Sequence, residues 1–292
     1  MPFTKTLQIS LLFGSIFVAL SLTPAFAAKE IWTITESMET PESAYYDPES
    51  DLIFVSNVAG APDQKDGKGW ISKISPQGKI LSAKWVDHLS APKGLRAKNG
   101  VLWVTNIDEV VSIEIKSARI LSRVSIPDAK FLNDLVIGED NTVYVSDTFA
   151  NAIFQIRDQK PTLFVKGNWT DGPNGLLIQG KYLIVASWGN PNPDWSTKTP
   201  GRLLRFGLNT HKRYGLSPAP LGNLDGLELE ESGNYLVSDW VAGRIFRVTP
   251  KGEAHEIFSG FKNSADIGYI LKSKILLVPQ MGANKVSAFT DF

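Results

Sequence analysis

The sequence predicts an all-β protein: a six-bladed β-propeller with four-stranded antiparallel blades around a central channel. It carries six copies of one pattern, in which a polar residue or pair precedes an apolar run, a Gly/Asn/Asp turn and a second apolar run. Apolar runs rich in Val, Ile and aromatic residues between such turns are typical of strands. Repeats of about 40–50 residues with several strands each are typical of propellers.

The six units follow one another along the chain. They are ESAYYDPESDLIFVSN (42–57), KGLRAKNGVLWVTN (93–106), NDLVIGEDNTVYVSD (133–147), NGLLIQGKYLIVAS (174–187), DGLELEESGNYLVSD (225–239) and ADIGYILKSKILLVPQ (265–280). A third strand-like run follows, such as AIFQIRD (152–158) or RIFRVTP (244–250). A two-sheet sandwich has similar strand content but would not explain six copies of one pattern. A single domain follows, because no blade buries its faces without its neighbours.

The first residues predict a secretory signal peptide at 1–27. The apolar stretch LLFGSIFVALSL (11–22) is too short to span a bilayer, and Ala25-Phe26-Ala27 forms a small-residue cleavage pattern. An uncleaved anchor helix is the alternative. Cleavage after Ala27 leaves a propeller domain at 28–292, expected to be periplasmic or secreted.

Composition narrows the function. The 292 residues include no cysteine and have a formal net charge of zero. Thiol catalysis, cysteine metal sites and a disulfide scaffold are therefore excluded. Balanced charge without a basic run argues against a nucleic-acid partner. We expect no membrane association after signal cleavage, and a monomer that binds a small molecule.

In a propeller, the innermost strand of each blade lines the central channel. The residue just before this strand therefore lies at one mouth of the channel, on the same face in every blade. The equivalent residues of six blades should therefore form one ring. This ring is Glu42, Lys93, Asn133, Asn174, Asp225 and Ala265-Asp266. The Ser-Asp pairs that end the second strands, 146–147 and 238–239, are expected to satisfy backbone groups in the following turn.

Oxygen donors dominate this ring. Carboxylates and amides are the ligands that a hard cation such as Ca²⁺ takes, whereas the absence of Cys and His disfavours zinc and copper. Ca²⁺ is the expected ion, with Mn²⁺, Mg²⁺ or Zn²⁺ as alternatives. A second interpretation is that the Asn-Asp, Asn-Gly and Asp-Gly pairs only make turns between blades, since Lys93 and Ala265 do not match the donor pattern.

Four stretches carry a resemblance to a known family: LNDLVIGEDNTVYVSDT (132–148), GPNGLLI (172–178), LDGLELEESGNYLVSDW (224–240) and ADIGYILKSKILLVPQ (265–280). They resemble the family of senescence marker protein, gluconolactonase and luciferin-regenerating enzyme, which is related to paraoxonase-like and strictosidine-synthase-like propellers. The resemblance covers essentially all of 28–292 and implies a six-bladed propeller, in agreement with the repeat count.

The resemblance also implies site residues. It implies a divalent metal ion held by Glu42 in TPESAYYD, Asn174 in GPNGL and Asp225 in LDGL. It places Asn133 near metal and substrate, and it implies that Asp225 also serves as the base for water attack on a lactone.

The substrate is not implied, because this chain departs from the family there. Members that act on sugar lactones have an arginine where this chain has Phe131, and no histidine matches the catalytic pair of paraoxonase-like enzymes. Lys93 would weaken metal binding unless it points away or pairs with a carboxylate, and it could instead clamp an anionic substrate group.

Two long loops, 58–70 and 188–201, are predicted to lie on the ring face. Trp188 and Trp195 in the second loop, together with Phe131, would make the pocket partly apolar and suited to a hydrophobic lactone or ester. The alternative is that these are surface loops with aromatic residues packed beneath them.

The sequence therefore predicts an exported, metal-dependent hydrolase, a lactonase or esterase, with Asp225 and Asn133 as catalytic residues. The alternative is a non-enzymatic periplasmic ligand-binding or scaffold propeller with a structural metal ion. A third possibility is a different reaction at the same pocket, as in strictosidine-synthase-like relatives. A Ser-His-Asp hydrolase is disfavoured, because no G-x-S-x-G stretch exists.

Overall fold

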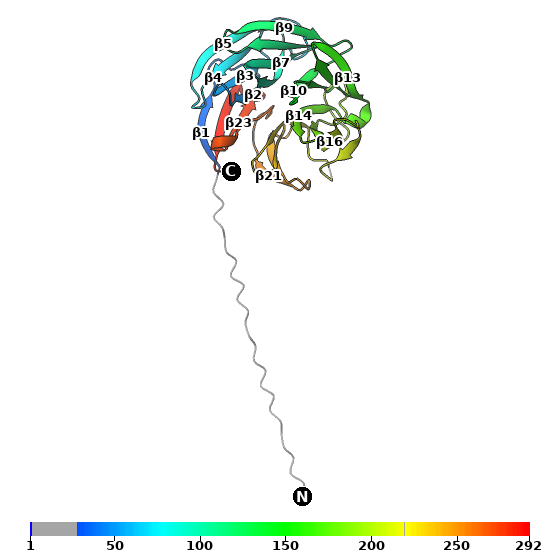
Figure 1. Cartoon of the computed structure of the whole chain (residues 1–292). Helices are drawn as coiled ribbons and strands as arrows, with labels where there is room; N and C mark the ends of the chain where they lie inside the picture. The colour runs from blue at the N-terminus through cyan, green and yellow to red at the C-terminus, as the bar shows by residue number, and fades with distance from the viewer. Residues whose placement is uncertain (2–27, 219) are drawn as a thin grey trace.

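The computed structural model describes residue 1 and residues 28–218 and 220–292, so the predicted signal peptide lies almost wholly outside the described residues. The described residues form six four-stranded antiparallel sheets arranged around a centre, as Figure 1 shows. The prediction of a six-bladed β-propeller is confirmed. No helix in the described part of the chain has the length and apolar character needed to cross a bilayer.

Within each blade, the first strand given below is the innermost, at the channel, and the last is the outermost. Blade 1 contains β2 (Pro41–Asp47), β3 (Leu52–Asn57), β4 (Gly69–Ile74) and β5 (Ile80–Leu89), and blade 2 contains β6 (Pro92–Lys98), β7 (Val101–Asn106), β8 (Glu109–Glu114) and β9 (Arg119–Ser125). Blade 3 contains β10 (Leu132–Ile137), β11 (Val143–Asp147), β12 (Ala152–Arg157) and β13 (Lys160–Lys166), and blade 4 contains β14 (Pro173–Gln179), β15 (Tyr182–Ser187), β16 (Leu203–Gly207) and β17 (Arg213–Gly215). Blade 5 contains β18 (Leu224–Leu229), β19 (Tyr235–Asp239), β20 (Arg244–Val248) and β21 (Ala254–Phe258). Blade 6 contains β22 (Gly268–Ile270), β23 (Ile275–Gln280), β24 (Lys285–Thr290) and β1 (Lys29–Ile34). Three single turns of 3₁₀ helix are η1 (Asn168–Thr170), η2 (Leu271–Ser273) and η3 (Met281–Ala283).

The ring is closed by pairing the two ends of the described chain. The outermost strand of blade 6 is β1, which pairs antiparallel with β24 and lies beside the last strands of the chain in Figure 1. The ladder runs from Lys29 opposite Thr290 to Ile34 opposite Val286. The repeat pattern begins only at Glu42, so it does not reveal this strand.

The core lies between neighbouring blades. Six large clusters of buried apolar side chains each combine residues from two adjacent blades. In the cluster that closes the ring, Ile34 and Val286 of blade 6 pack with Ile53 and Val55 of blade 1. Burial on both faces explains why the inner strands read as apolar runs.

A β-bulge occurs near the start of each inner strand in blades 1 to 5. In blades 2 to 5, two residues of the inner strand oppose one residue of its neighbour. In blade 1, Glu42 alone falls outside the ladder. The predicted ring residues of these blades are therefore the bulged residues, inside the inner strands rather than before them, and bulges re-aim side chains in this way.

The side chains at the ends of the second strands hold these bulges. Ser146 accepts a hydrogen bond from the Asp134 amide at 2.9 Å, and Ser238 accepts one from the Gly226 amide at 2.7 Å. The next residue, Asp147, accepts from the Ala150 amide in the following turn at 2.9 Å. The expected structural role of the Ser-Asp pairs is confirmed, and it includes the bulges as well as the turns.

Glycine follows the ring residue in blades 2, 4 and 5 because the inner strands approach one another closely. A Cβ added at Gly175 would lie 2.1 Å from the Asp225 carbonyl oxygen, and one added at Gly226 would lie 2.3 Å from the Ile267 amide nitrogen. These contacts with backbone atoms leave no room for a side chain.

Candidate functional site

The ring residues surround one end of the central channel. Glu42, Lys93, Asn133 and Asp225 line a cavity of about 220 Å³. Its remaining lining residues are apolar or aromatic: Pro62, Phe131, Trp188, Trp195, Trp240 and Met281. The structure therefore brings together ring residues from blades 1, 2, 3 and 5 and both of the long loops expected on this face.

Asn174 lies deeper than these four residues. It is 1% exposed and does not line the cavity. Its amide is close enough to Asp225 to lower the pKa of that carboxyl, but it makes no hydrogen bond of good geometry. Asn174 thus lies against the floor of the cavity, next to Asp225.

The oxygens at this floor lack hydrogen-bond partners. Oε2 of Glu42, Oδ1 of Asp225, and both Oδ1 and Nδ2 of Asn174 are buried without a partner. Burial of a polar atom without a partner costs free energy, and such groups in native proteins mark a missing ligand or a functional site. Three converging side chains with unsatisfied oxygens make this the strongest candidate site among the described residues.

Both carboxyls carry raised pKa values. Burial is the main cause for Glu42, and Asp225 and Asp266 raise its pKa further by repulsion while Lys93 lowers it. Burial is also the main cause for Asp225, and Asp266 and Asp134 add to it. A bound cation would relieve this repulsion.

No group of three or more His, Asp or Glu side chains is gathered for a metal ion in the described part of the chain. The predicted ligand set contains only two acids, Glu42 and Asp225, and its third member is the amide Asn174. Carboxylate and amide oxygens suit a hard divalent cation, with water molecules completing the shell. The residues present therefore fit the ion that the sequence implies.

Asn133 is held in place on the cavity wall. Its Nδ2 donates to Thr148 Oγ1 at 3.3 Å, and its backbone oxygen accepts from Thr105 Oγ1 at 2.5 Å. The side-chain Oδ1 is left for a ligand, because Asn133 lines the cavity and is 6% exposed.

The apolar wall is built from aromatic rings that pack against one another. Phe131 packs edge-on against Trp195 with ring centroids 4.7 Å apart, and Trp188 packs against Trp240 at 5.6 Å. The indole N–H of Trp188 donates to the Trp195 carbonyl oxygen at 3.3 Å, and that of Trp240 donates to Met281 Sδ at 3.2 Å. Neither indole donor is left for a ligand.

Sequence reasoning missed Pro62, Trp240 and Met281. A signal for Trp240 is present, because it directly follows the second strand of blade 5 as Trp188 follows the second strand of blade 4. Repeat equivalence would have placed both indoles on one face. Met281 follows β23 in the same way, at the start of η3.

A buried ion network lies around Arg96 of β6. Its guanidinium lies 3.4 Å from Asp266, 3.6 Å from Asp134 and 3.6 Å from Glu228, so it joins residues in or just before the inner strands of four blades. Burial alone would lower the pKa of Arg96, but the three carboxylates together raise it. The acid at the sixth ring position, Asp266, is therefore committed to this network and does not line the cavity.

This network makes stability depend on pH. Burial is the main cause that raises the pKa of Glu228 to about 8, with Arg96 lowering it and Asp266 raising it. An acid whose folded pKa exceeds its unfolded value loses its contribution to stability as the pH rises through the folded pKa. The native protein should lose free energy of unfolding as the pH rises from 6 to 9. We expect this loss to be smaller in Glu228→Gln by at least about 1 kcal/mol, measured by urea unfolding. Glu139→Gln, at an exposed glutamate, is the control; an unchanged pH dependence in Glu228→Gln would contradict the assignment.

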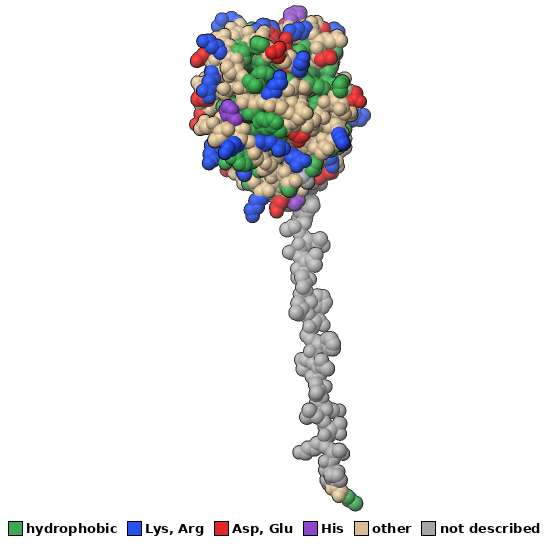
Figure 2. All heavy atoms as spheres, turned by 90° about the vertical axis from the view of Figure 1, so that its right-hand side faces the viewer, with side chains coloured by type: hydrophobic (Ala, Val, Ile, Leu, Met, Phe, Trp, Pro, Cys, Tyr) green, Lys and Arg blue, Asp and Glu red, His purple; other side chains and the backbone are tan. Residues whose placement is uncertain are grey.

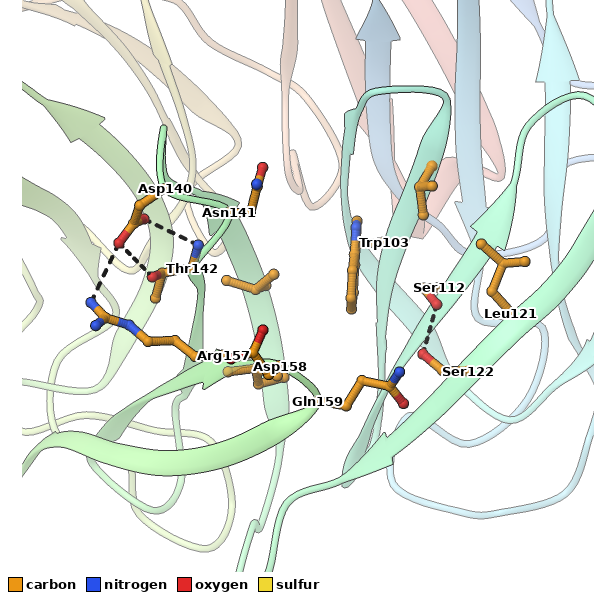
Figure 3. Close-up of a pocket in the computed structure, with 13 residues that line it drawn as sticks. Trp103, Ser112, Leu121, Ser122, Asp140, Asn141, Thr142, Arg157, Asp158 and Gln159 are labelled. Atoms are coloured by element: carbon orange, nitrogen blue, oxygen red, sulfur yellow. Dashed lines mark hydrogen bonds and ion pairs between the residues drawn. The ribbon is translucent and has the colours of Figure 1, made fainter.

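A larger cleft of about 530 Å³ lies between blades 2 and 3, away from the ring, and is shown in Figure 3. Several of its polar groups are paired: Asp140 accepts from Thr142 Oγ1 at 2.9 Å and lies 3.4 Å from Arg157, and the Ser112 and Ser122 hydroxyls are 2.7 Å apart. No buried, unpartnered carboxylate lines it, so chemistry points to the smaller central cavity.

Comparisons with known proteins agree with the fold. No family model matches the chain, and no curated protein matches it in sequence. Similar solved structures include a gluconolactonase from Xanthomonas campestris, with a TM-score of 0.66 and 12% identity over 85% of each chain. The calcium-binding protein regucalcin from Agrobacterium tumefaciens has a TM-score of 0.63 and 14% identity over 88% of this chain and 92% of that one.

A catalytically inactive histidine-to-alanine variant of virginiamycin B lyase from Staphylococcus aureus, solved with quinupristin, is also similar. It has a TM-score of 0.60 and 17% identity over 90% of this chain and 98% of that one. At these identities the likeness shows the six-bladed propeller fold alone. The neighbours include members of the family that the sequence resembles, so the resemblance is confirmed at the level of the fold.

Proposed function

We propose that this protein is a metal-dependent hydrolase, a lactonase or esterase, that acts on a small lactone or ester in the central cavity. One observation carries the proposal: the unpartnered, buried oxygens of Glu42, Asn174 and Asp225 converge at the floor of a cavity with aromatic walls. Glu42, Asn174 and Asp225 would hold the ion, for which Ca²⁺ suits the donor set. When bound, the ion supplies positive charge that polarises an ester carbonyl.

The chain's own residues complete the reaction. Asp225, whose pKa is raised by burial, accepts the proton of the attacking water as a general base. Asn133 orients the substrate, because its side chain is fixed by Thr148 and lines the cavity. The aromatic wall holds the apolar part of the substrate and excludes bulk water, which strengthens polar interactions within the cavity.

The neighbours include both a hydrolase and a lyase, and the positions of the histidines in this chain favour the hydrolase. The similar Xanthomonas protein is a gluconolactonase, and regucalcin is calcium-binding, so this fold is compatible with both parts of the proposal. The similar lyase variant is inactive after replacement of a histidine. The three histidines of this chain, at positions 88, 211 and 255, are exposed and none lines the cavity.

Export is a further part of the proposal, and it rests on the predicted signal peptide at 1–27. We expect the native protein to be recovered outside the cytoplasm with an N-terminus at Ala28, checked by cell fractionation and N-terminal sequencing. A protein that retains Met1 would contradict this.

The experiment that tests the activity uses residues 28–292 after removal of metal with a chelator. We expect Ca²⁺ to raise the melting temperature and to restore hydrolysis of members of a panel of lactones and aryl esters. Glu42→Gln is expected to lose both effects, while Glu139→Gln, at an exposed glutamate, keeps them. The same assay is run with Mn²⁺, Mg²⁺ and Zn²⁺.

The outcomes separate the candidate functions. No thermal response to any ion would overturn the metal site. A thermal response without turnover of any substrate would favour a ligand-binding propeller whose ion is structural.

A further inference from the structure

Lys93 is a buried cation that forms no direct ion pair within the described part of the chain. It is 2% exposed and belongs to β6 of blade 2, at a ring position. Its Nζ donates to the carbonyl oxygens of Pro62 at 3.1 Å and Ala91 at 3.2 Å, and it forms no ion pair with any carboxylate of the described residues. Lysine is almost never fully buried unless it is paired, so this arrangement needs a further partner.

The ammonium is held in one position. The two carbonyl oxygens account for two of its three N–H donors, and the ring of Phe131 lies 4.2 Å from Nζ. Glu42, Asp63 and Asp147 are near enough to favour the charged form, but burial dominates and lowers the pKa of Lys93 to about 8. One donor remains, on a side chain that lines the central cavity.

The rest of the cavity limits what this donor can meet. Glu42, Asn133 and Asp225 line it at the proposed ion site, and its other lining residues are Phe131, Trp188, Trp195, Trp240, Met281 and Pro62. Because the indole N–H groups of Trp188 and Trp240 are already used, a polyhydroxylated ligand would lose hydrogen bonds where it meets these two indoles. The cavity volume of about 220 Å³ suits a small ligand.

We propose that Lys93 anchors a carboxylate of the substrate, and that the substrates are small compounds with an apolar ring or chain and a negatively charged carboxylate group. This inference rests on the proposed function in taking the central cavity as the substrate site. The carboxylate supplies the missing counter-ion of Lys93, and the aromatic wall receives the apolar body. A sugar lactone satisfies neither requirement.

The test is a binding measurement that does not depend on turnover. Trp188, Trp195 and Trp240 line the cavity, so ligand binding should change the intrinsic fluorescence of the protein. Three probes of similar size differ in charge: phenylacetate, phenylacetamide and phenethylammonium. Each is titrated into metal-free protein and into Ca²⁺-loaded protein, because in the loaded protein a carboxylate could also bind the ion.

We expect the native protein to bind phenylacetate about tenfold or more tightly than phenylacetamide, and, once Ca²⁺ occupies the acids, phenethylammonium most weakly. Lys93→Met, which keeps most of the length of the side chain and removes its charge, is expected to lose this preference in metal-free protein while its affinity for phenylacetamide stays the same. Lys65→Met is the matched control, because this exposed lysine of the same face pairs with Asp108 and does not line the cavity. Its preference should equal that of the native protein.

Each contrary result overturns the inference. Equal binding of the acid and the amide by the native protein removes the anchor, and this measurement holds even if Lys93→Met fails to fold. A preference retained in Lys93→Met assigns it to another group. Metal-dependent hydrolysis of neutral esters without any preference for anions leaves the hydrolase standing and overturns the anchor alone. Selective binding of phenylacetate without hydrolysis of any ester supports the anchor and overturns the proposed hydrolase.

Discussion

Asp225→Asn is expected to abolish both hydrolysis and the response to Ca²⁺, with kcat/KM reduced by about a thousandfold or more. The residue has two roles in the proposed site. It offers an unpartnered, buried oxygen to the ion, and it takes the proton of the attacking water. Asparagine keeps the shape of the side chain but cannot accept a proton as a base at neutral pH. The measurements are the melting temperature with and without Ca²⁺ and the rate on the best substrate of the panel.

The same substitution should leave the metal-free protein at least as stable as the native protein. Burial and the neighbouring acids Asp266 and Asp134 raise the pKa of Asp225, so its charged form is unfavourable in the fold without a cation. Substitution of a structural residue lowers the free energy of unfolding, whereas substitution of a functional residue that destabilises the fold leaves it unchanged or raises it. Asp140→Asn, at an exposed pair with Arg157, is the control and should change neither property. Loss of stability in metal-free Asp225→Asn, together with retained turnover, would contradict the assignment.

Arg96→Met is expected to destabilise the protein by about 3–5 kcal/mol, the largest effect on stability among the substitutions considered. The guanidinium is the shared partner of Asp134, Glu228 and Asp266, and removing it leaves these carboxylates buried without compensation. A loss of this size is a large part of the free energy of unfolding of an ordinary domain. Urea unfolding at pH 8 measures it.

The destabilisation should shrink as the pH falls. Arg96 lowers the pKa values of Asp134 and Glu228, so in its absence both acids become protonated at higher pH and the repulsion among them disappears. We expect a smaller difference at pH 5 than at pH 8. Arg123→Met removes an exposed pair with Glu109 and should cost no more than about 1 kcal/mol. A change of that small size in Arg96→Met would show that the network is not needed for stability.

The six blades could be predicted because each blade is built from local signals. A Gly/Asn/Asp turn between two apolar runs specifies a hairpin within about fifteen residues, and six copies of it specify a ring. Ring residues such as Glu42 and Asp225 could be predicted for the same reason, since equivalent positions of a repeat occupy equivalent places. What remained hidden was that they lie in bulges, because a bulge is defined by the partner strand.

The sequence by itself therefore determined the blade count, the face on which the polar residues gather and the oxygen-rich character of that ring. Only the tertiary structure decided which ring residues reach the cavity: Glu42 and Asp225 do, whereas Asn174 lies against its floor and Asp266 belongs to Arg96. It also decided that β1 closes the last blade and that Lys93 forms no direct ion pair with any described residue. The reason is physical: repeats follow from contacts between near neighbours in the chain, whereas closure, depth and charge pairing depend on residues from different blades.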